Sequence, residues 1–479
     1  MDYLDFNTLD GTSLKLKAVT VDEFRNKLRG QSIIQGDPEY NESRVIWNGS
    51  TDKHPAIMIK CSGSADVIDA VNFAREHGIV VAVRGGGHNV AGNALCDGGM
   101  VIDLSKMNSV RVIEKTRRAF VGGGALLGDV DRETQVFGLA APLGVVSLTG
   151  VAGLTLCGGL GYLRRKHGMA CDALVSVDIV TADGKLVHAS KAENEDLFWG
   201  VRGGGGNFGV VTSFEFELYP VGPTVTLCAP FYPMNEHTAD LVCSWRDFMS
   251  DTPEEITSNC LFWSVPAHAH FPEELQGIPV VIPAAIHIGD PEEAGDLMKP
   301  LRELGNPILD LSGPLPYVDL QTAFDPLFSK GERQNYWKSL YLNTLDENAI
   351  EKIVERAHNR PDPWSLIALW HLGGEMNRVN PVETALGIRS ANYLLSLDTS
   401  WTDSADNESA IAWTREAWAE MQPYSGGGSY LNFPGQGEEG EVLLRASYGS
   451  NNYDSLVNLK RKYDPTNLFR LNQNISPAA

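Results

Sequence analysis

Residues 79–89 read IVVAVRGGGHN, which predicts a glycine-rich loop at the end of a strand. A buried strand of mostly apolar residues runs into three consecutive glycines, which a histidine follows. Consecutive glycines let the backbone turn several N–H groups toward one point, which forms a concave site for a pyrophosphate. His88, at the end of such a loop, would then lie beside the bound group. Taken alone, the stretch is explained equally well by a tight turn with a hydrogen-bonded histidine.

Two further glycine-rich stretches follow. The first reads LGVVSLTGVAG at 143–153 and CGGLG at 157–161, which suits backbone that packs along a flat ring, or a buried loop between strands. The second reads WGVRGGGGNFG at 199–209 and contains GxGxxG from Gly204 to Gly209. A Rossmann site needs a strand before this motif and a helix after it. The residues after it are strand-like, so we do not expect a nicotinamide site.

Composition restricts the class of function. The chain has 479 residues, which predicts two or three domains, and a formal net charge of −22. A surface this acidic repels phosphate backbones, so we expect no nucleic-acid partner. The seven cysteines include no CxxC spacing, and His268 and His270 have no further ligand nearby in sequence. We therefore expect neither a disulfide framework nor a metal site.

The N-terminal residues and the hydropathy of the sequence predict where the protein is located. The N-terminus lacks a basic segment followed by an apolar core, and no run of about 18 apolar residues occurs. We expect a cytoplasmic protein that does not span a membrane. Hydrolase and kinase motifs such as GxSxG, HExxH and GxxxxGK[ST] are absent from the sequence.

Apolar periodicity outlines several elements. Residues 64–77 predict a helix that Ser64 caps and Gly78 ends. Residues 175–189 predict a β-hairpin. Residues 460–475 predict a tail that returns to the first part of the chain.

The three glycine-rich stretches, in this order, resemble the FAD-linked oxidases of the berberine bridge enzyme type, within the vanillyl-alcohol oxidase superfamily. The similarity begins at GDPEY (36–40), ends at YDPTNLFRLNQNI (463–475), and is greatest to bacterial members of the 6-hydroxy-D-nicotine oxidase kind. It implies an α+β fold with a PCMH-type FAD-binding domain over 1–222. A substrate domain over 223–425 would cover the flavin ring with an antiparallel sheet backed by helices, and 426–479 would return to the first domain.

The resemblance also implies the cofactor contacts. His88 would bond covalently to the 8α-methyl group of FAD. A second bond through cysteine is not expected, because Val146 occupies the position of that cysteine and Cys157 is more typical of a packed small residue. The other expected FAD contacts are Arg84, Gly85, Gly86, Gly87, Asn89, Leu143, Gly144, Thr149, Gly150, Val151, Gly153, Gly158, Gly159, Gly161, Gly205, Asn207, Gly209, Val210, Asn432, Asn472 and Asn474.

Catalysis is expected near Tyr430-Leu431-Asn432-Phe433, where many relatives carry YxNY with a catalytic second tyrosine. Phe433 cannot accept a proton, as oxidation of an alcohol requires. A neutral amine releases hydride with the help of its lone pair, so an amine or N-heterocycle is favoured. Tyr430, His371 and Glu375 stay open as the base, with Asn432 beside them. The substrate pocket is expected to include Trp337, Lys338, Tyr341, Trp370, Arg378 and Tyr393 as well.

The expected reaction is hydride transfer from a small organic molecule to flavin N5, followed by reoxidation with O2 to hydrogen peroxide. Thr149 stands where relatives control the access of O2. The alternatives on the same fold are an alcohol or carbohydrate oxidase, a dehydrogenase with another electron acceptor, and a natural-product tailoring enzyme. An alternative of another class is a flavin-bound, drug-sequestering protein. The sequence leaves the substrate and the oligomeric state open.

Overall fold

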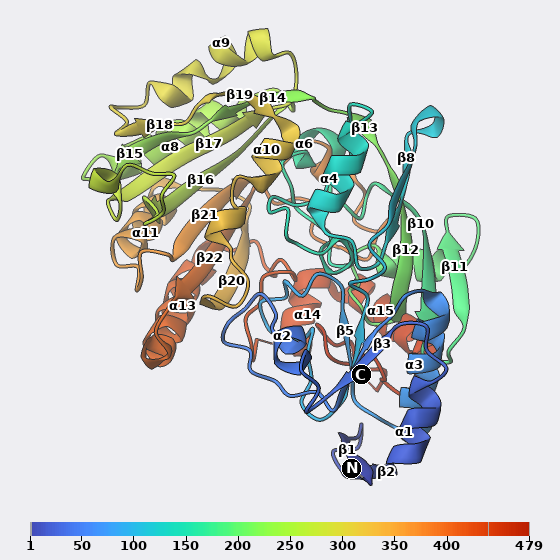
Figure 1. Ribbon diagram of the computed structural model, residues 1–479. Helices are drawn as coiled ribbons and strands as arrows, with labels where there is room; N and C mark the ends of the chain where they lie inside the picture. Colours follow the sequence, from blue (N-terminus) through green and yellow to red (C-terminus); the bar gives the residue numbers. More distant parts are fainter. Residues whose placement is uncertain (1, 439, 479) are drawn as a thin grey trace.

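A small sheet carries the first glycine loop at the end of one strand. In this computed structural model, which describes residues 2–438 and 440–478, the order is β3 (Gln31–Ile34), β4 (Ile57–Lys60), β6 (Met100–Asp103) and β5 (Val81–Arg84). Strands β4, β6 and β5 are parallel and buried, as their apolar sequences require. The chain leaves β5 directly into Gly85, so the sheet fixes where the loop begins (Figure 1).

Helix α3 (Ser64–His77) links β4 to β5 and has the predicted bounds. Its C-cap is Gly78, whose φ of 62° is left-handed, as the sequence predicted. The prediction for the other end was wrong: Gly63 is the N-cap and Ser64 is the first helical residue. This end has no side-chain cap among the described residues, and the carboxylate of Asp66 in the first turn instead accepts the N–H of Ser62, which precedes the helix, at 2.8 Å.

A second sheet carries the GxGxxG stretch. Its order is β11 (Leu186–Ser190), β10 (Leu174–Thr181), β12 (Gly209–Glu217), β8 (Arg118–Gly122) and β7 (Val110–Ile113), all antiparallel. Strands β10 and β11 form the predicted hairpin. Helix α7 (Glu195–Val201) precedes the motif and β12 follows it, so the elements occur in the opposite order to a Rossmann site.

The middle of the chain builds a nine-stranded antiparallel sheet. Its path runs β18 (Leu309–Asp310), β15 (Pro230–Pro233), β17 (Pro279–His287), β16 (Ile256–Ser264), β21 (Leu366–His371), β22 (Tyr393–Trp401) and β20 (Gln334–Leu342). Off this path, β14 (Thr224–Cys228) pairs with β17, and β19 (Gly313–Pro316) pairs with β14. These strands lie within the range predicted for the substrate domain, whose exact bounds stay a prediction. The sheet lies beside the first part of the chain, which carries the glycine loops (Figure 1).

The two faces of this sheet differ, because neighbouring residues of a strand point to opposite sides. Phe262, Ile367 and Leu397 belong to the core on the outer face. That core includes residues of helices α8 (Thr238–Ser250), α9 (Pro291–Arg302), α11 (Glu347–His358) and α13 (Asn407–Met421). The inner face is left to cover the glycine loops.

The C-terminal segment returns to the first part of the chain, as the sequence predicted. Helices α14 (Glu441–Tyr448) and α15 (Ser450–Tyr463) lead into the tail. Asn207 of the third glycine loop accepts the N–H of Ile475 at 3.0 Å and donates to the carbonyl of Gln473 at 3.1 Å. Lys460 is fully buried, pairs with Asp464 and donates to the carbonyl of Asn207 at 2.8 Å. The mixed architecture confirms the predicted α+β class.

The helices were also compared with the length and apolar character that a bilayer span requires. None of those within residues 2–438 and 440–478 meets both conditions.

Candidate active site

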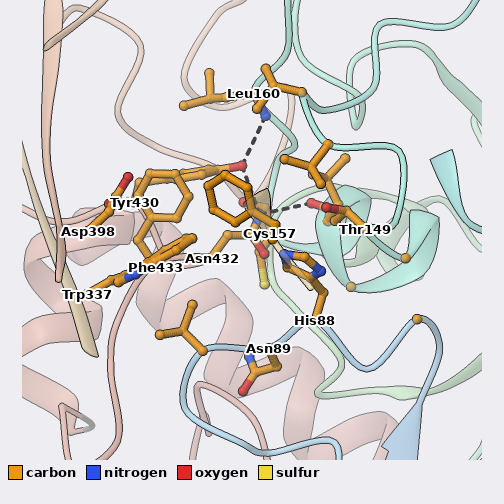
Figure 2. A pocket seen from close by; sticks show the side chains of 18 of the residues that line it. His88, Asn89, Thr149, Cys157, Leu160, Trp337, Asp398, Tyr430, Asn432 and Phe433 are labelled. Carbon is orange, nitrogen blue, oxygen red and sulfur yellow. Dashed lines mark hydrogen bonds between the residues drawn. The ribbon is translucent and has the colours of Figure 1, made fainter. Parts of the chain in front are cut away.

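A cavity of about 420 Å³ lies where the glycine loops, the nine-stranded sheet and the C-terminal tail meet (Figure 2). The loops and the tail line one part of it, and the inner face of the sheet lines another. Most of this lining is apolar or backbone. The cavity therefore suits a flat, largely apolar ligand that lies between the loops and the sheet.

Two glycines hold the first two loops against each other. A Cβ atom on Gly86 would lie 2.5 Å from the Cα of Gly150, and one on Gly150 would lie 2.4 Å from the backbone nitrogen of Gly86. Neither position has room for a side chain. The close approach of the loops thus explains Gly86 and Gly150, and it shapes one wall of the cavity.

The structure brings about half of the predicted cofactor residues to the cavity. Those that line it are Gly85, Gly86, Gly87, His88, Asn89, Thr149, Gly150, Gly153, Gly209, Asn432 and Asn472. The cavity lining does not include Arg84, Leu143, Gly144, Val151, Gly158, Gly159, Gly161, Gly205, Asn207, Val210 or Asn474.

Several residues of the second group hold the loops in place. Arg84 forms a buried ion pair with Asp103 and donates to the carbonyl of Ser43. Gly161 packs so closely that a Cβ atom would lie 1.7 Å from the carbonyl oxygen of Leu143. Such residues shape the wall from behind.

His88 is half-buried, since its ring opens onto the cavity. The ring stacks on Trp47, with 4.3 Å between ring centroids and 15° between planes. Enclosure away from water lowers the pKa of His88 to about 3, because the imidazolium loses its hydration. The imidazole is therefore neutral at ordinary pH, and a neutral ring nitrogen is nucleophilic.

Tyr430 and Asn432 reach the cavity together (Figure 2). The Tyr430 hydroxyl oxygen accepts the backbone N–H of Gly159 at 3.1 Å, that of Leu160 at 3.0 Å and the amide of Asn432 at 2.8 Å. Three N–H groups point at this oxygen, which has two lone pairs to accept them, and burial raises the pKa of the phenol. Tyr430 thus ties the second loop to the C-terminal segment.

Phe433 contacts three aromatic rings of the cavity wall. Its centroid lies 4.8 Å from that of Tyr430, 5.5 Å from that of Trp337 and 6.0 Å from that of Trp370. The position thus contributes an apolar surface.

The other two candidate bases lie away from the cavity. The His371 side chain is buried beside Tyr393, with ring centroids 5.5 Å apart, and is not part of the cavity lining. Glu375 pairs with Arg378, which in turn pairs with Glu254 at the surface. The structure therefore does not bring His371 and Glu375 together with Tyr430 and Asn432.

Only some of the predicted pocket residues reach the cavity. Trp337 and Trp370 line the cavity. Lys338, the neighbour of Trp337, points to the other side, where it pairs with Glu438 and lies over the ring of Trp418. Tyr341, Arg378 and Tyr393 do not line the cavity either.

Asp398 is a candidate that the sequence reasoning missed. It lies on β22 directly opposite Trp337 of β20, only 7% of it is exposed, and it lines the cavity. Its Oδ2 accepts the Ser396 hydroxyl at 3.2 Å, and Oδ1 has no hydrogen-bond partner within the described part of the chain. Burial raises the pKa of Asp398 to about 7. A carboxylate in the apolar run YLLSLDTSW is the signal that could have revealed it.

Comparisons with known proteins agree with this geometry. The family described as FAD binding domain matches residues 55–190, and the family described as Berberine and berberine like matches residues 429–476. An FAD-linked oxidoreductase of Dictyostelium discoideum is 31% identical, over 95% of this chain and 97% of the relative. The (R)-6-hydroxynicotine oxidase of Paenarthrobacter nicotinovorans is 30% identical, over 94% and 97%.

This chain belongs to the berberine bridge enzyme-like FAD-linked oxidoreductases. The crystal structure of 6-hydroxy-D-nicotine oxidase from Arthrobacter nicotinovorans has a TM-score of 0.83 to it at 29% identity and covers 94% of this chain and 98% of that one. Chitooligosaccharide oxidase has the same TM-score of 0.83 at 25% identity, over 96% and 100%. The family therefore assigns the cofactor and the class of reaction.

The wall of this FAD-linked oxidoreductase fits its cofactor. Three buried amide atoms, Asn93 Nδ2, Asn472 Oδ1 and Gln473 Oε1, have no hydrogen-bond partner within residues 2–438 and 440–478. All three residues line the cavity beside the glycine loops. Buried polar groups rarely stay unpaired, and the hydroxyl, N–H and carbonyl groups of FAD are suitable partners for them.

Proposed function

We propose that the enzyme is an oxidase that holds FAD through one covalent bond to His88 and takes a hydride from a small organic molecule, preferably an amine or N-heterocycle. The observation that carries this proposal is the single cavity that joins His88 and the glycine loops to the apolar face of the sheet. When bound, FAD supplies the hydride acceptor. The chain positions the substrate over it and excludes water.

The chemistry of His88 supports the tether. The ring is neutral, is held by its stack on Trp47, and opens onto the cavity. Gly85–Gly87 and Asn89 would hold the cofactor on the same side.

Two side chains support a single bond. Val146 lines the cavity at the position where relatives carry the cysteine that forms a second bond to the flavin. Cys157 also lines it, but burial raises the pKa of its thiol to about 12, so that little thiolate is present at neutral pH. The thiolate is the reactive form of cysteine, and Cys157 is therefore a poor nucleophile here.

The segment Tyr430–Phe433 supports the preference for an amine. Phe433 has no proton acceptor, and the Tyr430 oxygen is already occupied by three donors. This segment therefore cannot readily take the O–H proton of an alcohol. A neutral amine avoids that step, because its own lone pair assists the departure of hydride.

Thr149 supports the use of dioxygen. It lines the cavity beside Gly150, and a side chain close to valine in size would leave a path for O2 there. The product would be hydrogen peroxide. The cytoplasmic location stays a prediction, with which the free state of all seven cysteines is compatible.

A test uses the purified yellow protein under argon. We expect aromatic secondary amines to bleach the flavin absorbance, and admission of air to restore it with formation of hydrogen peroxide. Bleaching by sugars or alcohols alone would contradict the preference for amines. Slow recovery in air, with fast recovery on addition of a quinone, would contradict the oxidase assignment.

A further inference from the structure

The inner face of the large sheet forms an aromatic and aliphatic chamber over the glycine loops. Its members include Phe231, Leu261, Trp263, Ile282, Leu366 and Trp370. No lysine or arginine lines this cavity among the described residues. A carbohydrate is recognised through many hydroxyl groups, and this wall offers few partners for them. An anionic molecule would find no cation.

Asn259 also lines this wall, and its Oδ1 accepts from Arg164 at 2.6 Å. Three further polar atoms of the wall are unpaired within the described residues. They are Asp398 Oδ1, Trp263 Nε1 and Trp337 Nε1, each buried and without a hydrogen-bond partner in the described part of the chain. The three residues are 7%, 4% and 8% exposed. They line the main cavity and also a small cavity beside it, which Arg333, Asn335 and Ser400 complete. One acceptor and two donors that face an enclosed space indicate a bound polar group.

The position of these atoms follows from the strands. Trp337 and Asp398 are direct partners of neighbouring antiparallel strands, so their side chains lie on the same face. Trp370 donates from Nε1 to the Ser396 hydroxyl at 3.1 Å, and Ser396 in turn donates to Asp398 Oδ2 at 3.2 Å. This chain of hydrogen bonds fixes the carboxyl group and leaves Oδ1 without a partner in the described part of the chain. Figure 2 shows Asp398 in the cavity wall near Tyr430 and Trp337.

We infer that Asp398 is the group that recognises the substrate, and that the substrate is a largely aromatic molecule with one basic nitrogen. The inference rests on the proposed function and names the substrate class of the same site. The N–H of the substrate donates to Asp398 Oδ1, and the indoles of Trp263 and Trp337 can donate to a second heteroatom of the molecule.

The proton balance is simple. A substrate that arrives as an ammonium ion gives its N–H proton to the Asp398 carboxylate: the N–H bond breaks, an O–H bond forms, and the nitrogen regains its lone pair. The neutral amine then loses hydride from the adjacent carbon as the carbon–nitrogen bond becomes double. FAD is the oxidant, as in the proposed function.

The test compares the wild type with Asp398→Asn, which keeps the shape and removes the charge. Asp296→Asn, an exposed position of α9, is the matched control. The probes are N-methyl-1-naphthylmethylamine and its ether analogue 1-(methoxymethyl)naphthalene. The rate of anaerobic flavin bleaching, measured at increasing amine concentration, gives the amine Kd, and competition by the ether gives its Ki. Flavin content per chain is measured for each protein.

We expect the wild type and D296N to bind the amine at least about tenfold more tightly than the ether, as a charge-assisted hydrogen bond provides. In D398N the two should differ by less than about threefold at unchanged flavin content. If D398N still preferred the amine over the ether as strongly as the wild type does, the inference would be overturned while the FAD assignment stands. Bleaching by cellobiose and by no aromatic amine would overturn it as well. A colourless wild-type protein would instead overturn the proposed function itself.

Discussion

His88 and Asp398 belong to different walls of one cavity, and burial shifts both toward their neutral forms. Loss of hydration lowers the pKa of the His88 imidazole to about 3 and raises that of the Asp398 carboxyl to about 7. The first shift keeps a nitrogen free to bond to the cofactor. The second shift lets the Asp398 carboxylate accept a proton near neutral pH.

The titration of Asp398 gives a pH dependence. The ionised form must accept the proton, so kcat/KM for an amine should rise as pH increases through about 7 and be lost below it. The other titratable groups that line the two cavities are His88, Cys157, Tyr162, Tyr430 and Arg333. Burial lowers the pKa of His88 to about 3, raises that of the Cys157 thiol to about 12 and raises those of both phenols. It also lowers the pKa of Arg333 from its high normal value.

We therefore expect Asp398→Asn to remove the limb near pH 7 from the profile of kcat/KM. The ionisation of the free amine lies well above this range and should persist in the variant. A limb near pH 7 of unchanged shape in D398N would assign it to another group.

At the scale of elements, sequence patterns predicted several helices and strands, but not which face of each strand lines the cavity. The hairpin of β10 and β11, the helix α3 and the order of elements around GxGxxG were all predictable. Trp337 and Lys338 were both assigned to the pocket, although neighbours on a strand point to opposite sides. Asp398 was missed because its proximity to Trp337 depends on strand pairing between distant segments.

The contact between the first two glycine loops gives a test at this scale. Gly86→Ala places a methyl group against the Gly150 backbone, which cannot move without displacing the second loop. We expect a lower Tm and a lower flavin content per chain. Gly295→Ala on α9 is the control, since nothing lies within 4 Å of its Cβ position, and it should be neutral or slightly stabilising. Equal behaviour of the two variants would show that the loops do not need to touch.

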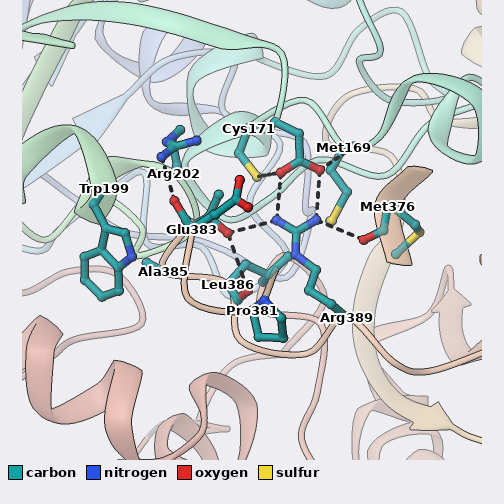
Figure 3. Close-up of polar contacts among 12 residues, drawn as sticks. Met169, Cys171, Trp199, Arg202, Met376, Pro381, Glu383, Ala385, Leu386 and Arg389 are labelled. Carbon is teal, nitrogen blue, oxygen red and sulfur yellow. Dashed lines mark hydrogen bonds and ion pairs between the residues drawn. The ribbon is translucent and has the colours of Figure 1, made fainter. Parts of the chain in front are cut away.

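At the scale of the whole molecule, a buried ion pair joins the two parts of the chain (Figure 3). Arg389 donates to both carboxylate oxygens of Asp172, at 2.7 and 2.8 Å, and also to Thr384 and the carbonyl of Met376. Arg202 adds a hydrogen bond to the carbonyl of Glu383 at 2.6 Å. These contacts hold the segment before β22 against the first part of the chain.

Removal of one partner leaves the other charge buried. We expect Arg389→Gln to destabilise the protein by about 3–5 kcal/mol in urea unfolding. Arg378→Gln removes an exposed ion pair with Glu254 and should cost about 1 kcal/mol or less. A variant of Arg389 as stable as that of Arg378 would mean that the two parts are held together by other contacts.

The link between FAD and His88 is tested most directly by precipitating the protein in acid and following the yellow colour. The proposed covalent bond to His88 predicts that the flavin stays with the wild-type precipitate and with that of His270→Ala, an exposed control. It predicts that His88→Ala releases its FAD into the supernatant. Release of FAD from the wild type would contradict the tether, and retention in His88→Ala would assign the bond to another residue, of which Cys157 is the first to test.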